Sequence, residues 1–409
     1  MIENFKIENK FKIFIFFNIF FVVFYLFIKH DVGNDSSISE WLINYKGGFT
    51  RRGFGGEIGI FLSKFLGLSL RQSIFLLQSL IHVSYLIIIL NYLKNIKFNL
   101  FQIFALFAPI FILYPIAEIE VLGRKEMLLF LFFIISIYFC DKKYSPQILN
   151  YNIFFLFPIL CLIWEQVVLF APYFAILIIF KNNLKLLKKV ILYLFIIFCP
   201  SIITFFIIFL NPLSEQGHQI MCSYLLNEFG EKCYMSANLL IKNTIYFDTW
   251  DVVHQNAKLE HYLRYLLIFL FGFLPLNLLI IQNSFKSKSN FINSNFSLLV
   301  IFSLLYLPSI LLFIFGYDWG RWINISYTFT ILLYFFLLKN NHISNKIYIK
   351  NSNLLRLFNK KTFIIPLFII FAFGWNPKTV ITGDVGTKPI YQIPRKAAKI
   401  FYNDYLKEN

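Results

Sequence analysis

Runs of apolar residues long enough to cross a lipid bilayer recur along the chain, separated by short charged segments. The hydrocarbon core of a bilayer is about 30 Å thick, and a helix needs about 20 apolar residues to cross it. Hydrophobic residues make up 58% of the 409 residues and charged residues only 14%, whereas about a quarter of the residues of a soluble domain are charged. The pattern excludes a water-soluble fold and predicts an all-α, polytopic transmembrane helix bundle.

The apolar runs predict about 10–11 spans, several of them shorter than usual. Basic segments flank residues 152–180 on both sides, so this stretch is expected to enter the membrane and return as two short helices or a re-entrant pair that turn near residue 165. The alternative is one long span with a topology error elsewhere. The other expected spans are residues 11–28, 73–93, 100–116, 127–140, 190–210, 263–281, 296–315, 323–338 and 363–375.

Basic residues indicate which side of the membrane each segment faces. Lys6, Lys10 and Lys12 precede the first span, which places the N-terminus in the cytoplasm by the positive-inside rule. When the spans alternate from there, almost the whole net charge of +17 lies on the inner side. The charge therefore reports orientation in a cell inner (plasma) membrane crossed several times, and no nucleic-acid partner is expected.

The domain organisation that follows is a single bundle over residues 1–376, with outer loops at 29–71 and 211–262. Residues 377–409 are expected to form an extracytoplasmic C-terminal tail. Within the first loop, residues 58–70 have the pattern of an amphipathic helix at the membrane surface. Cys222 and Cys233 lie in the second loop on the oxidising side, where a disulfide is expected. The alternative is two unpaired thiols.

Polar residues gather in four clusters at the expected outer ends of the spans. The first contains TRRGFGGE, residues 50–57. Adjacent Arg51 and Arg52 offer guanidinium groups that suit a phosphate or carboxylate, glycines let backbone approach a ligand, and Glu57 supplies a carboxylate. The alternative is a juxtamembrane anchor whose arginines touch lipid headgroups.

The second and third clusters carry further charges. Residues 118–126, EIEVLGRKE, include Glu120, Arg124 and Lys125. If this segment is helical, Glu120 and Arg124 stand at i,i+4 and can pair; otherwise it is a solvated turn. Glu165 lies at the turn of the 152–180 hairpin, where burial raises a carboxyl pKa unless an arginine keeps the group ionised. It is a possible general acid or base, or part of a structural ion pair.

The fourth cluster is GYDWGRW, residues 316–322, with Asp318, Trp319 and Arg321. Its tryptophans are either aromatic residues of the membrane interface or stacking platforms for sugar rings. All four clusters are assigned to the outer side, and we expect them to meet in one cavity that binds an anionic, lipid-borne ligand. The sequence has no CxxC, HExxH, Walker or GxSxG pattern, so neither a metal nor a cofactor is expected.

Together these motifs resemble segments of bacterial polytopic membrane proteins from surface-polysaccharide gene clusters. The layout is similar to O-antigen and capsule polymerases and to the C-type glycosyltransferase superfamily. The resemblance implies that Arg51, Arg52, Arg124 and Arg321 hold a polyprenyl diphosphate and that Glu57, Glu165 or Asp318 activates an acceptor hydroxyl. Glu120, Lys125 and Trp319 would complete the substrate site. The first loop lacks the Asp-x-Asp or Glu-x-Asp pair of many C-type enzymes.

The expected function is an integral-membrane glycosyltransferase or polymerase in cell-surface polysaccharide biosynthesis. Its partners would be a polyprenyl-diphosphate-linked glycan at the outer leaflet and the membrane lipids. The alternative is a lipid-linked oligosaccharide flippase or other transporter, which would share the arginines but usually shows internal repeats and a central charged path. A structural or assembly subunit would tolerate substitutions in the clusters.

Overall fold

The computed structural model describes residues 8–30, 36–94, 96–238, 240–241, 255–288, 290–344, 361–387, 394–395, 398–399 and 402. The fold is all-α, as the sequence predicts. Beside the helices, two short strands, β1 (Trp375–Asn376) and β2 (Gly386–Thr387), pair antiparallel, with Trp375 opposite Thr387.

Seven described helices are long and apolar enough to cross a membrane, and the chain is a multi-pass membrane protein in contact with lipid. Two shorter apolar helices are α7 (Glu126–Phe139) and α19 (Lys361–Phe373). The long helices are fewer than the apolar runs counted in the sequence, because some runs are broken. They are α1 (Glu8–Lys29), α4 (Leu70–Leu93), α8 (Pro146–Ile163), α10 (Leu187–Leu210), α14 (Leu259–Gln282), α16 (Leu298–Phe315) and α17 (Trp319–Lys339).

The run at residues 100–116 forms two short helices and not one span. Asn99 caps the first, α5 (Leu100–Leu106), in a capping box with Gln102. Pro109 follows the end of α5, and Pro115 lies in the first turn of α6 (Tyr114–Ala117). Proline lacks an amide hydrogen and cannot continue a helix in its interior. The apolar run therefore supplies buried turns instead of a continuous membrane helix.

The expected hairpin at residues 152–180 is confirmed. Helix α8 ends at Ile163, Trp164 is extended, and the chain returns through the 3₁₀ helix η2 (Glu165–Phe170) and α9 (Ala171–Lys181). The Asn150 amide donates to Asn182 Oδ1 at 3.3 Å, which joins the two ends of the stretch. The hairpin places Glu165 at its turn.

The chain divides into two compact units. Unit 1 comprises residues 1–21, 90–121 and 249–409, and unit 2 comprises residues 22–89 and 122–248.

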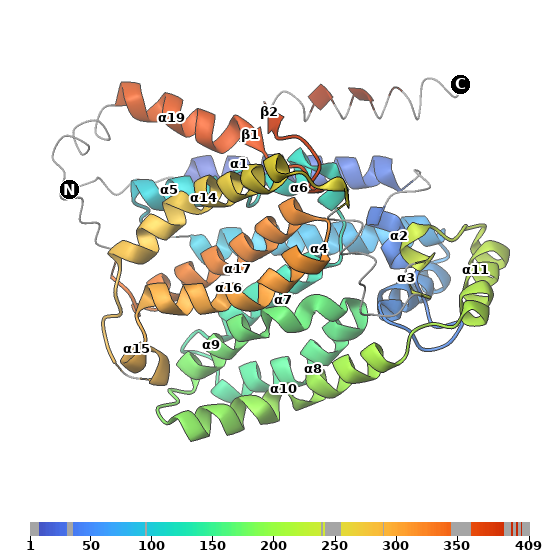
Figure 1. Cartoon of the computed structure of the whole chain (residues 1–409), viewed down its shortest axis with the longest axis horizontal. Helices are drawn as coiled ribbons and strands as arrows, with labels where there is room; N and C mark the ends of the chain where they lie inside the picture. Colours follow the sequence, from blue (N-terminus) through green and yellow to red (C-terminus); the bar gives the residue numbers. More distant parts are fainter. Residues whose placement is uncertain are drawn as a thin grey trace. The chain divides into compact units, whose positions relative to one another are not determined.

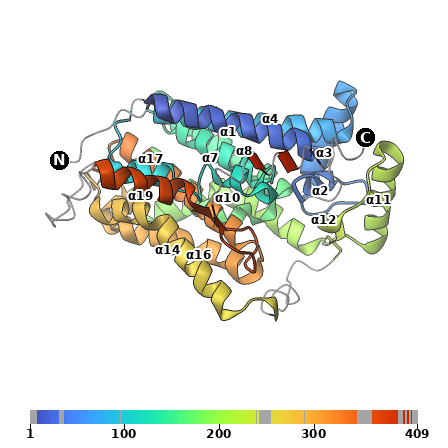
Figure 2. The ribbon, with the colours of Figure 1, turned by 90° about the horizontal axis from the view of Figure 1, so that it is seen from above.

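In unit 1, α17 is the central helix, and 94% of its apolar window is buried although it carries several polar residues. Polar side chains in membrane helices face protein and not lipid. Helices α14 and α16 pack on α17 (Figures 1 and 2), and α5 packs on α14 and α19. The shorter elements are η1 (Ile119–Val121) and α15 (Phe291–Asn295).

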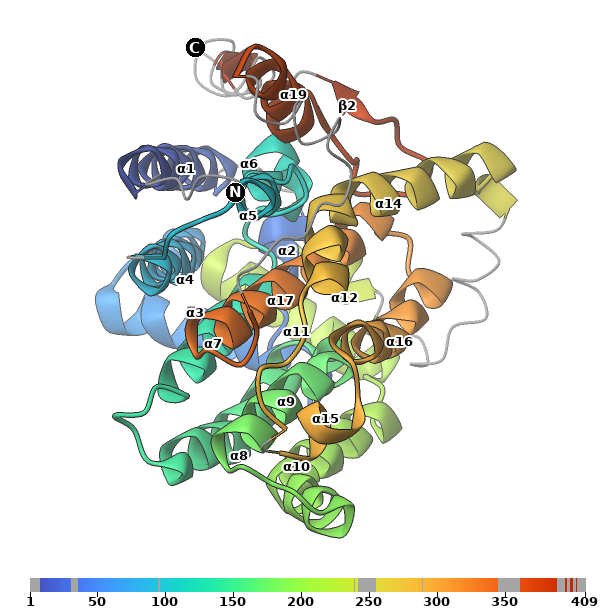
Figure 3. The same cartoon turned by 90° about the vertical axis from the view of Figure 1, so that its left-hand side faces the viewer.

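In unit 2, α8 and α10 lie side by side (Figure 3), and η2 and α9 pack against both. Only 22% of the apolar window of α10 is buried, so most of this helix is an exposed apolar surface suited to lipid. Shorter helices among the described residues of this unit include α2 (Ser36–Leu42), α3 (Gly53–Leu66), α11 (Glu215–Phe229) and α12 (Met235–Asn238). Helix α2 packs on α3 and α12.

Helix α3 corresponds to the expected amphipathic helix, but it begins five residues earlier and ends at Leu66. Its glycines, Gly53, Gly55, Gly56 and Gly59, are buried, whereas Phe61 and Phe65 are exposed and stack on each other. Exposed aromatic rings on one face of a short helix are typical of contact with a membrane interface.

Candidate functional site

The site in unit 2 begins with the backbone of Arg52. Arg52 precedes the first residue of α3 and has a left-handed conformation, with φ of 65°. A non-glycine residue in this region is strained, at a cost of about 1–3 kcal/mol, and such residues concentrate at functional sites. In this conformation the Arg52 carbonyl and the Arg52 guanidinium bind two different segments of the chain.

The guanidinium of Arg52 binds the carboxylate of Glu165 at the turn of the hairpin. Arg52 Nη2 lies 2.7 Å from Glu165 Oε1, and Arg52 Nε donates to Oε2 at 3.0 Å. This two-point contact fixes both the distance and the plane of the carboxylate. The two side chains are 17% and 12% exposed, so the ion pair is largely buried but has an accessible edge.

Glu165 is ionised in this arrangement. Burial raises the pKa of its carboxyl, but the Arg52 charge and hydrogen bonds, helped by the Arg51 charge, outweigh burial and lower the pKa to about 2. The structure shows Glu165 in an ion pair with Arg52. In this state Glu165 is a weak base.

Lys125 binds the backbone carbonyl of Arg52. Its ammonium donates to the Arg52 carbonyl at 2.8 Å and lies 5.8 Å from the centre of the Trp41 ring. The side chain is 1% exposed. Burial and the nearby Arg52 charge lower the pKa of Lys125 to about 7, against the opposing charges of Glu40 and Glu165. Lys125 is therefore a cation that can lose its proton near neutral pH.

Arg124 forms a buried ion pair with Glu40 on α2. The condition for pairing with Glu120 is not met, because the 118–126 segment is not one helix. It consists of η1, a turn at Gly123 with φ of 78°, and the start of α7. Glu120 is exposed in η1, in unit 1.

The turn before Arg124 and Lys125 is held by hydrogen bonds to a single carbonyl. Gly123 O accepts from Trp41 Nε1 at 2.7 Å and from Gln78 Nε2 at 3.0 Å. Trp41 and Gln78 come from α2 and α4, so three segments that are far apart in the sequence fix this turn. The two cations therefore project from a rigid backbone.

Glu57 and the glycines of the first cluster have structural contacts. The Tyr45 amide donates to Glu57 Oε1 at 2.8 Å, which closes the loop that precedes α3. Gly56 lies against backbone: a Cβ there would be 2.0 Å from the Ile43 carbonyl oxygen. The glycine-rich sequence thus lets the loop and α3 approach each other closely, and this accounts for a pattern that we interpreted as room for a ligand.

Unit 1 holds the fourth sequence cluster. Arg321 Nη1 lies 3.1 Å from Asp318 Oδ2, and the Arg321 guanidinium stands 4.9 Å from the centre of the Trp322 ring. Trp319 packs edge-to-face against Tyr262, Tyr265 and Phe313, at centroid distances of 5.4–6.0 Å. Trp319, the first residue of α17, is therefore part of an aromatic cluster.

A second ion pair in unit 1 was not anticipated. Lys378 Nζ lies 3.1 Å from Glu118 Oε2, and the Glu118 side chain is only 4% exposed. The segment with Lys378 is anchored because Gly320 N donates to the Thr379 carbonyl and Tyr265 Oη donates to the Lys378 carbonyl at 2.6 Å. Residues 378–381 of the expected tail are thus packed on the protein.

The structure groups the predicted residues by unit. Arg51, Arg52, Arg124, Lys125 and Glu165 gather in unit 2, and we call them the unit 2 charge cluster. Glu120, Asp318, Trp319 and Arg321 belong to unit 1, with Asp318 and Arg321 in contact. Sequence reasoning did not select Glu40 or Lys378 as site residues. Glu40 is an acid in an otherwise uncharged stretch, and this pattern indicates an ion pair or a site. Nothing in the sequence around Lys378 sets it apart.

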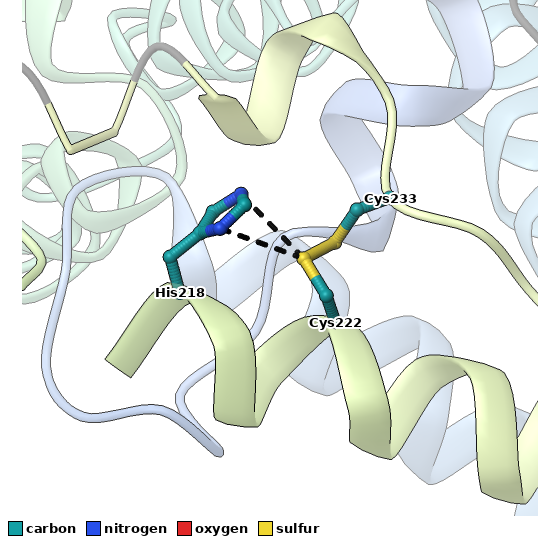
Figure 4. Close-up of side chains that lie close together, drawn as sticks. All are labelled: His218, Cys222 and Cys233. Carbon is teal, nitrogen blue, oxygen red and sulfur yellow. Dashed lines mark hydrogen bonds between the residues drawn. A yellow bond between two sulfur atoms is a disulfide. The ribbon is translucent and has the colours of Figure 1, made fainter. Parts of the chain in front are cut away.

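Three residues of types that can bind a metal ion lie close together in unit 2: His218, Cys222 and Cys233. The two sulfur atoms are bonded to each other, which confirms the expected disulfide, and His218 Nε2 lies 3.5 Å from Cys222 Sγ (Figure 4). Thiolates bind metals, but disulfide sulfurs do not offer that charge. The group is therefore a disulfide covered by an imidazole, and it packs on Ile43, Leu213 and Met221.

No protein-family model, curated protein or solved structure matches this chain. What is established is a polytopic membrane protein with about seven spans.

Proposed function

We propose that the protein is an integral-membrane glycosyltransferase or polymerase that uses polyprenyl-diphosphate-linked saccharides at the outer leaflet of the inner membrane. The observation that carries the proposal is the unit 2 charge cluster. The strained Arg52 residue joins Lys125 through its carbonyl and Glu165 through its guanidinium. Strain and buried charge have a cost, and a role in binding an anion accounts for both.

A diphosphate would bind at the accessible edge of this cluster. Arg51 and Arg52 would offer guanidinium donors to the phosphate oxygens, and guanidinium groups suit such contacts better than ammonium groups. During glycosyl transfer the bond between the anomeric carbon and the diphosphate oxygen breaks, and negative charge develops on the leaving diphosphate. Preorganised cations stabilise that charge more than the charge of the ground state.

Ligand binding would also change the chemistry of Glu165. A diphosphate that neutralises Arg52 removes the interaction that keeps Glu165 ionised, and burial then raises the pKa of the carboxyl. The carboxylate becomes a better base in the loaded site. It can then accept the proton of the acceptor hydroxyl as the oxygen attacks the anomeric carbon. Glu165 thus links diphosphate binding to acceptor activation.

Further predicted roles remain part of the proposal: Glu57 or Asp318 as the group that activates the acceptor hydroxyl, Arg321 as a contact to the diphosphate, and Glu120 and Trp319 as substrate-binding residues. The Glu57 contact to Tyr45 N gives it a structural use as well. Each residue is tested by its own substitution, and Arg321→Gln is the most direct case because its guanidinium is buried and ion-paired.

The test is a strain that lacks this protein, complemented with wild-type, Arg52→Gln or Glu165→Gln chains, followed by analysis of lipid-linked intermediates and surface glycan. We expect both variants to insert normally and to leave the glycan short or incomplete. The matched control is Glu228→Gln, at an exposed position of α11, which should complement fully. Wild-type glycan length with both site variants would remove the proposal, and intermediates trapped on the inner leaflet would indicate a flippase.

A further inference from the structure

A cavity of about 440 Å³ in unit 1 is surrounded by lysines. Four lysines line it, Lys94, Lys97, Lys286 and Lys339, together with two asparagines, Asn91 and Asn341. The remaining lining residues are apolar. Ligand sites in proteins commonly have volumes of about 300–1,000 Å³. The cavity is thus large enough for a phosphate-bearing group.

The cavity forms where the C-terminal ends of three membrane helices meet. Lys94 follows the end of α4, Lys286 follows the end of α14, and Lys339 is the last residue of α17. The sequence segments 91–97, 281–288 and 338–343 contain no Asp or Glu. The positive-inside rule assigns all three ends to the cytoplasmic side.

Hydrogen bonds hold the walls of the cavity in place. Lys339 Nζ donates to the Tyr92 carbonyl at 2.6 Å and lies 4.0 Å from the centre of the Tyr92 ring, which fastens α17 to α4. Lys286 N donates to the His342 carbonyl at 2.8 Å, next to the backbone pairing of Phe285 with Ile343. One side-chain contact and two backbone contacts therefore hold together the segments that surround the cavity.

Helix dipoles explain why a lysine lies near each helix end, but they do not explain why lysines from three helix ends line the same cavity. A cation near a C-terminus is stabilised by about 0.3–1 kcal/mol through the dipole, and this does not require a shared hollow. Four lysine side chains around one hollow give it a positive potential, which favours a bound anion there.

We propose that this cavity binds a phosphate-bearing anion on the cytoplasmic side, separately from the unit 2 charge cluster. Lysine ammonium groups bind phosphate as point charges without demanding one geometry. Basic pockets between membrane helices on this side suit anionic lipid headgroups, and a soluble phosphate compound has the same chemistry. The proposal does not depend on the enzymatic function.

The test uses the purified full-length protein with two probes. One probe is nanodiscs of phosphatidylcholine with or without phosphatidylglycerol, read out as lipid retained in native mass spectrometry. The other is inorganic pyrophosphate, read out as a shift in thermal unfolding. The site variant is Lys94→Gln, Lys97→Gln and Lys286→Gln combined, with Lys339 kept because of its bond to Tyr92 O. The matched control is Lys185→Gln, Lys188→Gln and Lys189→Gln combined, three exposed lysines of unit 2.

We expect the site variant to bind at least about ten-fold more weakly and the control to change less than about two-fold, with binding retained by the corresponding triple Lys→Arg variant. Selective retention of phosphatidylglycerol identifies a headgroup site, and a pyrophosphate shift identifies a site for soluble phosphates. Equal losses in the site and control variants would show diffuse surface attraction and overturn the proposal. So would unchanged binding in the site variant, or no binding of either probe to wild-type protein.

Discussion

The Arg52 guanidinium and the Glu165 carboxylate are 113 residues apart in the sequence, yet their Nη2 and Oε1 atoms lie 2.7 Å apart. Arg52 directly precedes α3 and Glu165 begins η2, so the ion pair ties the first loop to the turn of the α8–α9 hairpin. The same Arg52 residue accepts a hydrogen bond from Lys125. One residue thus fixes the relative positions of three segments of unit 2.

Glu165→Gln should lower the stability of unit 2 by about 2–3 kcal/mol, because the variant leaves the Arg52 charge buried without its carboxylate. Arg52→Gln should have a similar effect, and the double variant should lose less than the sum of the two. Thermal and denaturant unfolding in detergent give the coupling, expected at about 1–3 kcal/mol. A coupling near zero would mean that the contact contributes nothing. Glu228→Gln is the control.

The same ion pair should make stability depend on acid pH. The folded pKa of Glu165 is about 2, below the ordinary value of 4.5. A lowered carboxyl pKa contributes stability that is present above pH 4.5 and is lost as pH falls from 4.5 toward 2. The difference in unfolding midpoint between wild type and Glu165→Gln should therefore shrink over this range. A difference that stays constant with pH would contradict an ionised, paired Glu165.

Lys125 should also make stability rise with pH, but in the alkaline range. Its folded pKa of about 7 lies below the ordinary 10.5, so the unfolded chain binds more protons between these values and stability rises with pH. The slope is at most about 1.4 kcal/mol per pH unit. Lys125→Met should abolish this rise, whereas Lys232→Met, at an exposed lysine, should not. An unchanged pH profile in Lys125→Met would show that the ammonium is not destabilised by burial.

Gly56→Ala should destabilise unit 2 by at least about 3 kcal/mol, because the new methyl group would overlap the Ile43 carbonyl oxygen, which cannot move without displacing the loop. Gly59→Ala is the control on the same helix. Its Cβ would make ordinary contacts of 3.4–3.9 Å, so it should be tolerated or add up to about 1 kcal/mol through helix propensity. Unfolding in detergent measures both. Equal effects would refute the close approach at Gly56.

The Cys222–Cys233 disulfide should be detectable by alkylation of the unfolded protein. Before reduction only Cys140, Cys161 and Cys199 should react, and after reduction all five cysteines should. Replacing both bridged cysteines with serine should cost about 2–3 kcal/mol, because the bridge restricts the unfolded chain. Alkylation of all five before reduction would reject the bridge.

Parts of the site were accessible to sequence reasoning because the residue types are unusual in their surroundings. Arginines beside glycines, and a glutamate between apolar helices, are costly in a membrane protein and indicate ion pairs or binding sites. Glu40 carries a similar signal, as the single charged residue between Asp35 and Lys46. Lys378 carries none, because it becomes significant only when its segment packs beside Glu118.

Hydropathy and charge by themselves determined that this chain is an all-α membrane protein whose hairpin turns near Glu165, because the bilayer imposes the same requirement on every spanning segment. Partner choice within the clusters was decided by tertiary structure. Arg124 pairs with Glu40 on α2, and the turn at Gly123 breaks the helical i,i+4 spacing between Glu120 and Arg124. The glycines near Arg52 likewise serve packing, since only the folded chain brings the Ile43 carbonyl against Gly56.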